Sequence, residues 1–355
     1  MPSLRFFNLD LHISVIQDVK SNLYELFGDE IEIVNWSVSG HNWVFKQDTP
    51  TVDVVNQKSW VYMNHAMIQE FQARYDDILS TFDGFIVTHT PVFALLYEKY
   101  GKPVVMVNSC RYEQPFSWTN DMGMWEHLNA ALKRMYDARQ LIAISNNRAD
   151  VEYLKAGTGI QSEYIPSLCS YTKARYTPTR EDIVVYGNLN LFPPSTKLVE
   201  RPSSGYSWED LYAYKAIVHV PYEMSTMSTF EQITAGVPLF FPTKRFYVEC
   251  IQNGSMQLIS QYATQQILAQ VYDFYKSIDL WIDNADYYVD DGTPYTMKYL
   301  YYYDSFDDLV GQVESFNETD EIRQKRQEWL IARRERVLAD WKRIMISAYP
   351  QLSLD

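Results

Sequence analysis

Two glutamates, Glu223 and Glu231, are separated by seven residues within the stretch I-V-H-V-P-Y-E-M-S-T-M-S-T-F-E-Q-I-T-A-G-V-P-L-F-F-P-T, residues 217–243. Four of the residues between them carry hydroxyl groups, namely Ser225, Thr226, Ser228 and Thr229. Hydroxyl groups donate hydrogen bonds to anions, and the first turn of a helix adds backbone N–H groups that have no partner within the helix. The stretch therefore predicts a place that holds a phosphate group.

The residues around these side chains predict the elements that position them. Residues 217–220 read as a buried strand, which a loop carrying Glu223 follows, and then a helix carrying Glu231. Gly236 is expected to end that helix, and residues 237–241 read as a second apolar strand. This order places the phosphate site at the start of the helix.

The E-x7-E spacing, followed by A-G-V-P and a strand, resembles the donor-binding motif of retaining nucleotide-sugar glycosyltransferases of the GT-B fold, glycosyltransferase family 4-like. The resemblance implies that Glu223 faces the transferred sugar, that Glu231 binds the ribose hydroxyls, and that the hydroxyl-rich loop binds the diphosphate. A UDP- or GDP-sugar would be the donor substrate, and neither a metal nor a further cofactor is required. The alternative interpretation is that Glu223 caps the helix or is solvated, and that Glu231 lies on an exposed helix face.

The GT-B resemblance implies an α/β protein with two Rossmann-like domains that face a cleft, and it is most specific over residues 182–242. A chain of 355 residues is long enough for two such domains. Residues 1–170 are expected to form the acceptor-side domain and residues 171–318 the nucleotide-sugar domain. Residues 319–355 read as a long helix, and in GT-B enzymes the terminal helix packs back on the first domain.

The net charge and composition limit the kinds of molecule that the protein can bind. A formal net charge of −14 argues against nucleic acid as the general partner, because a polyanion is bound by basic surfaces. No apolar run approaches the length of a membrane span, and the three cysteines have no metal-ligand spacing. We expect a cytoplasmic protein whose partners are a nucleotide sugar and a glycan or small-molecule acceptor, and the oligomeric state stays open.

The chain begins with a β-α-β pattern in which residues 4–9 and 31–34 are strands and residues 13–27 a helix. Asp10 and His12 follow the first strand, where ligands gather in open α/β sheets. His12 has two interpretations, a base for an inverting transferase or a helix-entry residue without chemistry. The retaining family usually has a glycine-rich loop here, whereas N-L-D-L-H-I-S contains no glycine. The stereochemical outcome is therefore open.

A second β-α-β unit supplies further candidates for the acceptor side. Residues 82–88 and 104–107 read as strands, and residues 92–100 as the helix that joins them. The candidates that follow these strands are His89, Asn108, Arg111 and Tyr112. His89 is equally well explained as a hydrogen-bonded strand-end histidine, and Arg111 as a surface ion pair. His41, Trp43 and Phe45 are aromatic candidates in a loop that reads equally well as solvent-exposed.

In the second domain, residues 182–186 predict a strand that ends in Gly187 and Asn188. The resemblance implies that this loop faces the donor diphosphate. The nearest cations are Lys197 and Arg201, which are either phosphate ligands or surface charges. The Asp- and Tyr-rich residues 281–303 lack the ligand spacing of a calcium loop and read as an acidic surface loop.

Three further functions remain open. His12 as base would make the enzyme an inverting transferase, and a nucleotide-sugar epimerase has the same fold. The missing glycine loop also permits a non-catalytic sugar- or nucleotide-binding module. The chain contains no G-x-x-x-x-G-K-[ST], G-x-G-x-x-G or G-x-S-x-G, so ATPase, dehydrogenase and hydrolase functions lack their usual motifs.

Overall fold

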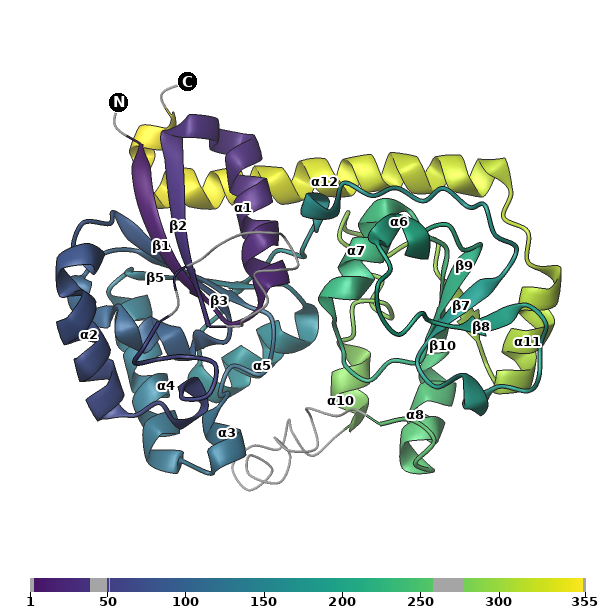
Figure 1. Ribbon diagram of the computed structural model, residues 1–355, viewed down its shortest axis with the longest axis horizontal. Helices are drawn as coiled ribbons and strands as arrows, with labels where there is room; N and C mark the ends of the chain where they lie inside the picture. The colour runs from purple at the N-terminus through teal and green to yellow at the C-terminus, as the bar shows by residue number, and fades with distance from the viewer. Residues whose placement is uncertain (1–2, 39–49, 51, 258–277, 354–355) are drawn as a thin grey trace. The chain divides into compact units, whose positions relative to one another are not determined.

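The computed structural model describes residues 3–38, 50, 52–257 and 278–353 (Figure 1). The aromatic candidates His41, Trp43 and Phe45 lie outside the described residues. Among the described residues the chain forms two compact units. Unit 1 contains residues from the ranges 3–167 and 338–353, and unit 2 those from 168–257 and 278–337.

Unit 1 is built on a parallel sheet with the strand order β2-β1-β3-β4-β5-β6. Its strands are β1 (Leu4–Asp10), β2 (Ile31–Ser37), β3 (Gly84–His89), β4 (Val104–Asn108), β5 (Leu141–Ser145) and β6 (Glu163–Tyr164). Its helices are α1 (Ile13–Phe27), α2 (His65–Leu79), α3 (Phe116–Thr119), α4 (Met122–Asp137) and α5 (Arg148–Thr158). Every residue of β4 is buried, as expected of a parallel strand with helices on both faces.

One local prediction in unit 1 is wrong. Residues 92–100 form two 3₁₀ turns, Pro91–Leu96 and Glu98–Tyr100, and every residue of the first turn is buried. Helix α5 continues to Thr158, and Gly159 ends it with a φ of 73°. Gly157 is needed for packing, since a Cβ there would lie 2.1 Å from the Tyr112 hydroxyl.

Unit 2 contains a second parallel sheet, with the strand order β11-β10-β9-β7-β8. Its strands are β7 (Ile183–Tyr186), β8 (Leu198–Glu200), β9 (Ala216–His219), β10 (Leu239–Pro242) and β11 (Tyr301–Tyr303). Its helices are α6 (Trp208–Leu211), α7 (Met227–Ala235), α8 (Lys244–Gln252), α10 (Ile278–Asp283) and α11 (Phe306–Ser315). Two parallel α/β sheets in one chain confirm the predicted fold class.

The helix α7 and its neighbours fold as the local sequence predicts. Thr226 caps the first turn of α7, and Gly236 ends the helix with a φ of 83°, which a residue with a side chain rarely adopts. Ser207 caps α6 together with Asp210 in a capping box. These local signals set both ends of the helix that carries Glu231.

The long terminal helix α12 (Asp320–Ala348) belongs to both units, because residues 320–337 group with unit 2 and residues 338–348 with unit 1. In unit 2, Arg326 forms a buried ion pair with Glu318. In unit 1, the Tyr349 ring just beyond the helix packs edge-on against Phe6 with centroids 5.0 Å apart. The chain just beyond α12 therefore packs against β1 within unit 1.

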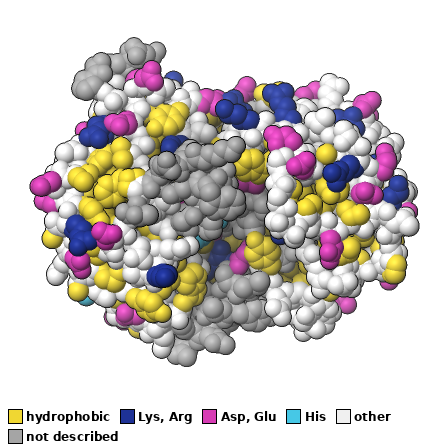
Figure 2. All heavy atoms as spheres, viewed as in Figure 1, with side chains coloured by type: hydrophobic (Ala, Val, Ile, Leu, Met, Phe, Trp, Pro, Cys, Tyr) yellow, Lys and Arg dark blue, Asp and Glu magenta, His cyan; other side chains and the backbone are white. Residues whose placement is uncertain are grey.

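The surface carries charges of both signs. Figure 2 shows Lys and Arg side chains interspersed with Asp and Glu on the visible face, without one large patch of either sign. None of the described helices is both long and apolar enough to cross a membrane.

Candidate functional site

A small pocket lies at the carboxyl ends of the strands of unit 2, where ligands bind in open α/β sheets. The ends of β7 and β9 meet there, because Tyr186 and His219 are register partners. The residues after β9 form one side of the pocket and the start of α7 another. Its cavity volume is about 20 Å³, which is room for one water-sized group. The pocket can therefore take one part of a larger ligand.

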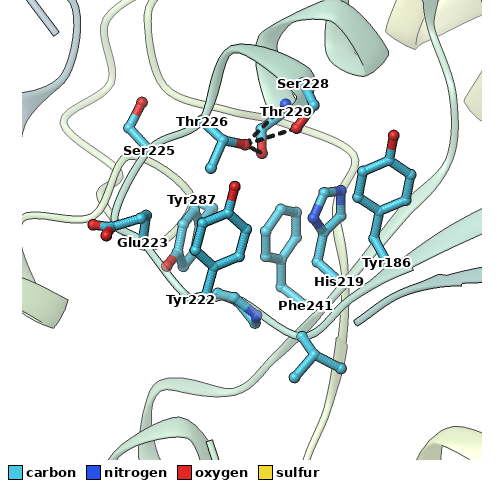
Figure 3. A pocket seen from close by; sticks show the side chains of 12 residues that line it. Tyr186, His219, Tyr222, Glu223, Ser225, Thr226, Ser228, Thr229, Phe241 and Tyr287 are labelled. Carbon is cyan, nitrogen blue, oxygen red and sulfur yellow. Dashed lines mark hydrogen bonds between the residues drawn. The ribbon is translucent and has the colours of Figure 1, made fainter. Parts of the chain in front are cut away.

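The start of α7 gathers three hydroxyl groups at this pocket. The Thr226 hydroxyl accepts a hydrogen bond from the backbone N–H of Thr229 at 3.3 Å and so caps the helix. It also lies 2.9 Å from the Ser228 hydroxyl and 3.0 Å from the Thr229 hydroxyl. Figure 3 shows these side chains turned toward one another, with Ser225 nearby on the same loop. Because the helix dipole is positive at this end, the cluster is suited to an anion.

Aromatic rings form the opposite wall of the pocket (Figure 3). The His219 ring stacks on Phe241 with centroids 4.7 Å apart and an angle of 2° between the planes. Phe241 in turn stacks on Tyr287 at 4.5 Å, and Tyr186 lies 5.6 Å from His219. Tyr222 is 51% exposed and lines the entrance. Flat rings of this kind suit a sugar or a base as well as ordinary packing.

His219 is a pocket residue that the sequence interpretation did not identify. Its Nε2 lies 2.6 Å from Oε1 of Gln232, so Nε2 carries the proton and Nδ1 remains a hydrogen-bond acceptor. Burial lowers the pKa of His219 to about 4, which keeps the ring neutral at pH 7. The signal in the sequence was a histidine at the carboxyl end of a predicted strand.

The two glutamates of the E-x7-E motif lie in different surroundings. Glu223 is half-buried, lines the pocket and contributes to raising the pKa of Tyr222 and of Tyr287. Glu231 does not line the pocket. Its Oε1 accepts a 2.5 Å hydrogen bond from the Tyr171 hydroxyl, and its Oε2 accepts one of 3.1 Å from Nε1 of Trp208. Glu231 is therefore held in a fixed orientation and is not a solvated helix-face residue.

Burial raises the pKa of Glu231, although the hydrogen bonds from Tyr171 and Trp208 act in the opposite direction. A carboxylate that is partly desolvated attracts further donors, because its oxygens keep free lone pairs. Sequence periodicity gave no sign of Tyr171 or Trp208 as its partners.

The two candidate cations lie at opposite ends of strand β8. Arg201 directly follows β8, and its guanidinium lies 4.5 Å from the ring centroid of Tyr186, a pocket residue. Lys197 directly precedes β8, whose first residue Leu198 pairs with Ile183, the first residue of β7. Since parallel strands begin at the same edge, Lys197 lies at the amino ends, away from the pocket. The structure does not bring Lys197 to the site.

Gly187 and Asn188 form the exposed loop after β7. Gly187 has a φ of 150°, and a Cβ at this position would lie 2.5 Å from Cβ of Val220, so only glycine permits this close approach. The Asn188 side chain accepts a hydrogen bond of 3.0 Å from the backbone N–H of Asn190 and caps a short 3₁₀ turn. Both residues lie at the carboxyl ends of the strands, because they directly follow Tyr186, the last residue of β7.

A second group of candidate residues lies at the carboxyl ends of the strands of unit 1. The rings of His12 and His89 are 5.2 Å apart, and His89 is the register partner of Asn108. His12 is exposed and occupies the N-cap position of α1 without a side-chain cap bond. Desolvation, together with His12 and Arg111, lowers the pKa of His89 to about 3. His89 is therefore neutral at pH 7, and Ser109 Oγ lies 3.4 Å from its Nδ1.

Asp10 and Asn108 are both fully buried at this edge. Asp10 accepts a 3.0 Å hydrogen bond from Nδ2 of Asn35. Neither amide atom of Asn108 has a hydrogen-bond partner among the described residues. A buried amide without partners is costly, so Asn108 is placed to bind a water molecule or a ligand hydroxyl.

Arg111 and Tyr112, the two candidates for acceptor contact after β4, are both buried. Nε of Arg111 lies 3.4 Å from Oδ1 of Asp150, so the suggested surface ion pair is instead a buried one. The Tyr112 hydroxyl accepts a 3.1 Å hydrogen bond from Nε1 of Trp125, and its ring packs between α4 and α5. Tyr112 is therefore a core residue. The neighbouring Glu113 is also buried, and burial raises its pKa to about 7.

The described residues contain no group of three or more His, Cys, Asp or Glu side chains that could hold a metal ion. The acidic residues of 281–303 do not form one either.

No protein-family model and no curated protein matches the chain. Among solved structures, the chain is similar to the glycosyltransferase of kitacinnamycin, at 10% identity and a TM-score of 0.46, over 97% of this chain and 99% of that one. It is also similar to CalG4, the calicheamicin glycosyltransferase, at 11% identity and a TM-score of 0.42, over 97% and 99%. A third similar structure is a putative UDP-N-acetylglucosamine 2-epimerase from Listeria monocytogenes, at 11% identity and a TM-score of 0.36, over 82% and 93%. With TM-scores below 0.5, the function rests on the residues of the site themselves.

Proposed function

We propose that the protein is a glycosyltransferase that transfers a sugar from a nucleotide-sugar donor to a glycan or another hydroxyl acceptor. Unit 2 would bind the donor and unit 1 the acceptor. Transfer would retain the anomeric configuration and would need no metal ion. The three cysteines are buried and form no disulfide, which suits an enzyme of the reducing cytoplasm.

The hydroxyl cluster at the start of α7 is the observation that carries this proposal. The Thr226 hydroxyl lies 2.9 Å from the Ser228 hydroxyl and 3.0 Å from the Thr229 hydroxyl, at the positive end of a helix. Negative charge grows on the diphosphate as it leaves the sugar, and donors that are already oriented stabilise it without reorganisation. Arg201 beside Tyr186 adds a positive charge at the same edge of the sheet.

Glu231 would bind the ribose of the donor. Its carboxylate is already oriented by Tyr171 and Trp208, and each oxygen keeps a lone pair for a ribose hydroxyl. Glu223 would face the transferred sugar from the loop after β9, which also lines the pocket. Ser225, Gly187 and Asn188 would complete the diphosphate site.

The acceptor would be bound by polar residues at the carboxyl ends of the strands of unit 1. Asn108 would donate to and accept from acceptor hydroxyls, because its buried amide has no other partner among the described residues. Asp10, His12, His89 and Arg111 would surround it.

One observation favours a second candidate mechanism. His12 is exposed, unlike Asp10, and an exposed histidine at this edge can act as the base of an inverting transferase.

The test is an assay of nucleoside diphosphate release across a panel of UDP-, GDP- and TDP-sugars, with and without sugar acceptors. Wild type is expected to release the diphosphate from at least one donor, and to do so in the presence of EDTA. Glu231→Ala should lose most of this activity. Full activity in Glu231→Ala would contradict the assignment of the donor site, and nucleotide binding without any turnover would favour a non-catalytic binding module.

A further inference from the structure

A second and larger hollow in unit 2 shares no lining residue with the pocket at the start of α7. It has a cavity volume of about 530 Å³, within the range of small-molecule sites. Three segments enclose it: the chain that enters unit 2 at Leu168, the carboxyl end of α7 at Thr234, and the middle of α12. It is therefore a pocket of unit 2 alone.

Three arginines line this hollow, Arg175, Arg333 and Arg334, and no Asp or Glu is among the described residues that line it. Such a group is unexpected in a chain with 45 acidic and 31 basic residues. Arg333 is 1% exposed, so its charge is fixed in the wall. Arg175 has no ion-pair partner among the described residues. Three guanidinium groups therefore gather at one hollow of an acidic protein.

The other lining groups suit an organic anion. The Oγ of Ser170 is buried and makes no hydrogen bond within the described part of the chain. Leu330 and Ile331 form an apolar stretch on α12, and Ile331 is 60% exposed. Guanidinium groups match the oxygens of phosphate in geometry and charge, and a large exposed aliphatic side chain beside them favours a ligand that also has an apolar part.

From this combination we propose that the hollow is a binding site for a small organic phosphate, distinct from the donor site. The phosphate lies among Arg175, Arg333 and Arg334, with the Ser170 hydroxyl as a further donor. The apolar part of the ligand covers Leu330 and Ile331.

The position of this hollow connects it to the donor helix. The Thr234 hydroxyl of α7 donates a hydrogen bond to the backbone carbonyl of Leu168, and Tyr171, one residue from Ser170, binds Glu231. A ligand here contacts the same chain segment that holds the α7 carboxylate.

Calorimetry with phenyl phosphate and with inorganic phosphate tests the proposal on the full-length protein. Phenyl phosphate should bind more tightly than inorganic phosphate, and added salt should weaken both, because the contacts are ionic. The double variant Arg175→Ala/Arg334→Ala should lose about tenfold or more in affinity, since a hydrogen bond to a charged group contributes about 1.5–3 kcal/mol. Arg336→Ala, an exposed arginine of α12 outside the hollow, is the matched control and should bind as wild type does.

Thr226→Asp separates this site from the donor site, because an aspartate at the start of α7 should repel phosphate there and leave the hollow intact. Unchanged phenyl phosphate binding in Thr226→Asp, with loss in the double arginine variant, supports the proposal. Equal affinity in wild type and the double variant would overturn it, as would loss in Thr226→Asp alone. Absence of binding to phenyl phosphate, with binding only to vesicles of anionic lipid, would overturn it too.

Discussion

The Tyr171 hydroxyl donates a 2.5 Å hydrogen bond to the Glu231 carboxylate, 60 residues further along the chain. Tyr171 lies in the segment where the chain enters unit 2, and Glu231 lies on α7. Trp208 binds the second carboxylate oxygen at 3.1 Å. The carboxylate proposed to bind ribose is thus oriented before any ligand arrives, which reduces the entropy lost on binding.

This orientation predicts a preference for ribose hydroxyls. Wild type should bind a nucleoside diphosphate about tenfold more tightly than its 2′,3′-dideoxy analogue, because hydrogen bonds to a charged group contribute about 1.5–3 kcal/mol. Glu231→Gln should lose most of that preference, and Tyr171→Phe should lose part of it. Calorimetry with the two ligands measures the ratio, and thermal unfolding checks that both variants fold. Equal binding of the two ligands to wild type would show that Glu231 does not bind ribose.

The opposite positions of Arg201 and Lys197 give a matched pair of variants. Arg201→Ala should weaken nucleoside diphosphate binding by about tenfold, because Arg201 follows β8 and lies at the edge of the pocket. Lys197→Ala should have no effect, because Lys197 precedes β8 at the amino edge. Equal losses in both variants would point to a general charge effect and would argue against a specific contact of Arg201 with the diphosphate.

The stereochemistry of transfer distinguishes the two roles of His12. For a retaining enzyme, NMR of the first product should show the anomeric configuration of the donor, and His12→Gln should lower turnover less than tenfold. A positioned general base contributes about 10²–10⁴-fold, so a loss of that size is expected only if His12 is the base of an inverting transferase. An inverted product together with such a loss would replace the retaining mechanism by the inverting one.

His219 and Glu113 predict opposite pH dependences of stability. The pKa of His219 falls to about 4 on folding, from about 6.5. As the pH falls from 6.5 to 4, the unfolded chain takes up a proton that the folded one does not, and stability declines by up to about 1.4 kcal/mol per pH unit. The pKa of Glu113 rises to about 7, from an ordinary value of 4.5. As the pH rises from 4.5 to 7, the unfolded chain loses a proton that the folded one keeps, and stability declines.

Urea unfolding between pH 5 and pH 8 tests both signs. His219→Gln should be less stable than wild type near pH 7 but should lose less on acidification. Glu113→Gln should lose less as the pH rises to 7. Curves for the His219 and Glu113 variants that run parallel to wild type would contradict the pKa shifts.

Local signals in the sequence predicted several of the elements. The apolar spacing of residues 13–27 predicted α1 to the residue. Gly236 ends α7 because only a glycine adopts its φ readily. Each of these signals acts over a few residues and does not depend on the rest of the chain.

The contacts that define the site could not be predicted in this way, because they join residues far apart in the chain. Lys197 and Arg201 are four residues apart, and the three-residue strand between them places them at opposite ends of the sheet's strands. The buried pair of Arg111 and Asp150 depends on the packing of α5 beside the end of β4. The orientation of His219 is set by its contacts with Gln232 and Phe241, and no short-range sequence pattern connects these residues to it.

Thr226 provides the most direct test of a diphosphate site at the start of α7. Serine and aspartate both cap helices as well as threonine does, so Thr226→Ser and Thr226→Asp should both keep the thermal stability of wild type. Only the aspartate places a negative charge among the hydroxyls of Ser228 and Thr229.

Calorimetry of UDP, GDP and TDP binding to these two variants and to wild type is the decisive measurement. We predict that wild type and Thr226→Ser bind at least one of these nucleotides with affinities within about threefold of each other, and that Thr226→Asp loses about a hundredfold or more through charge repulsion and desolvation. Binding to Thr226→Asp as tight as to wild type would contradict the proposed donor site.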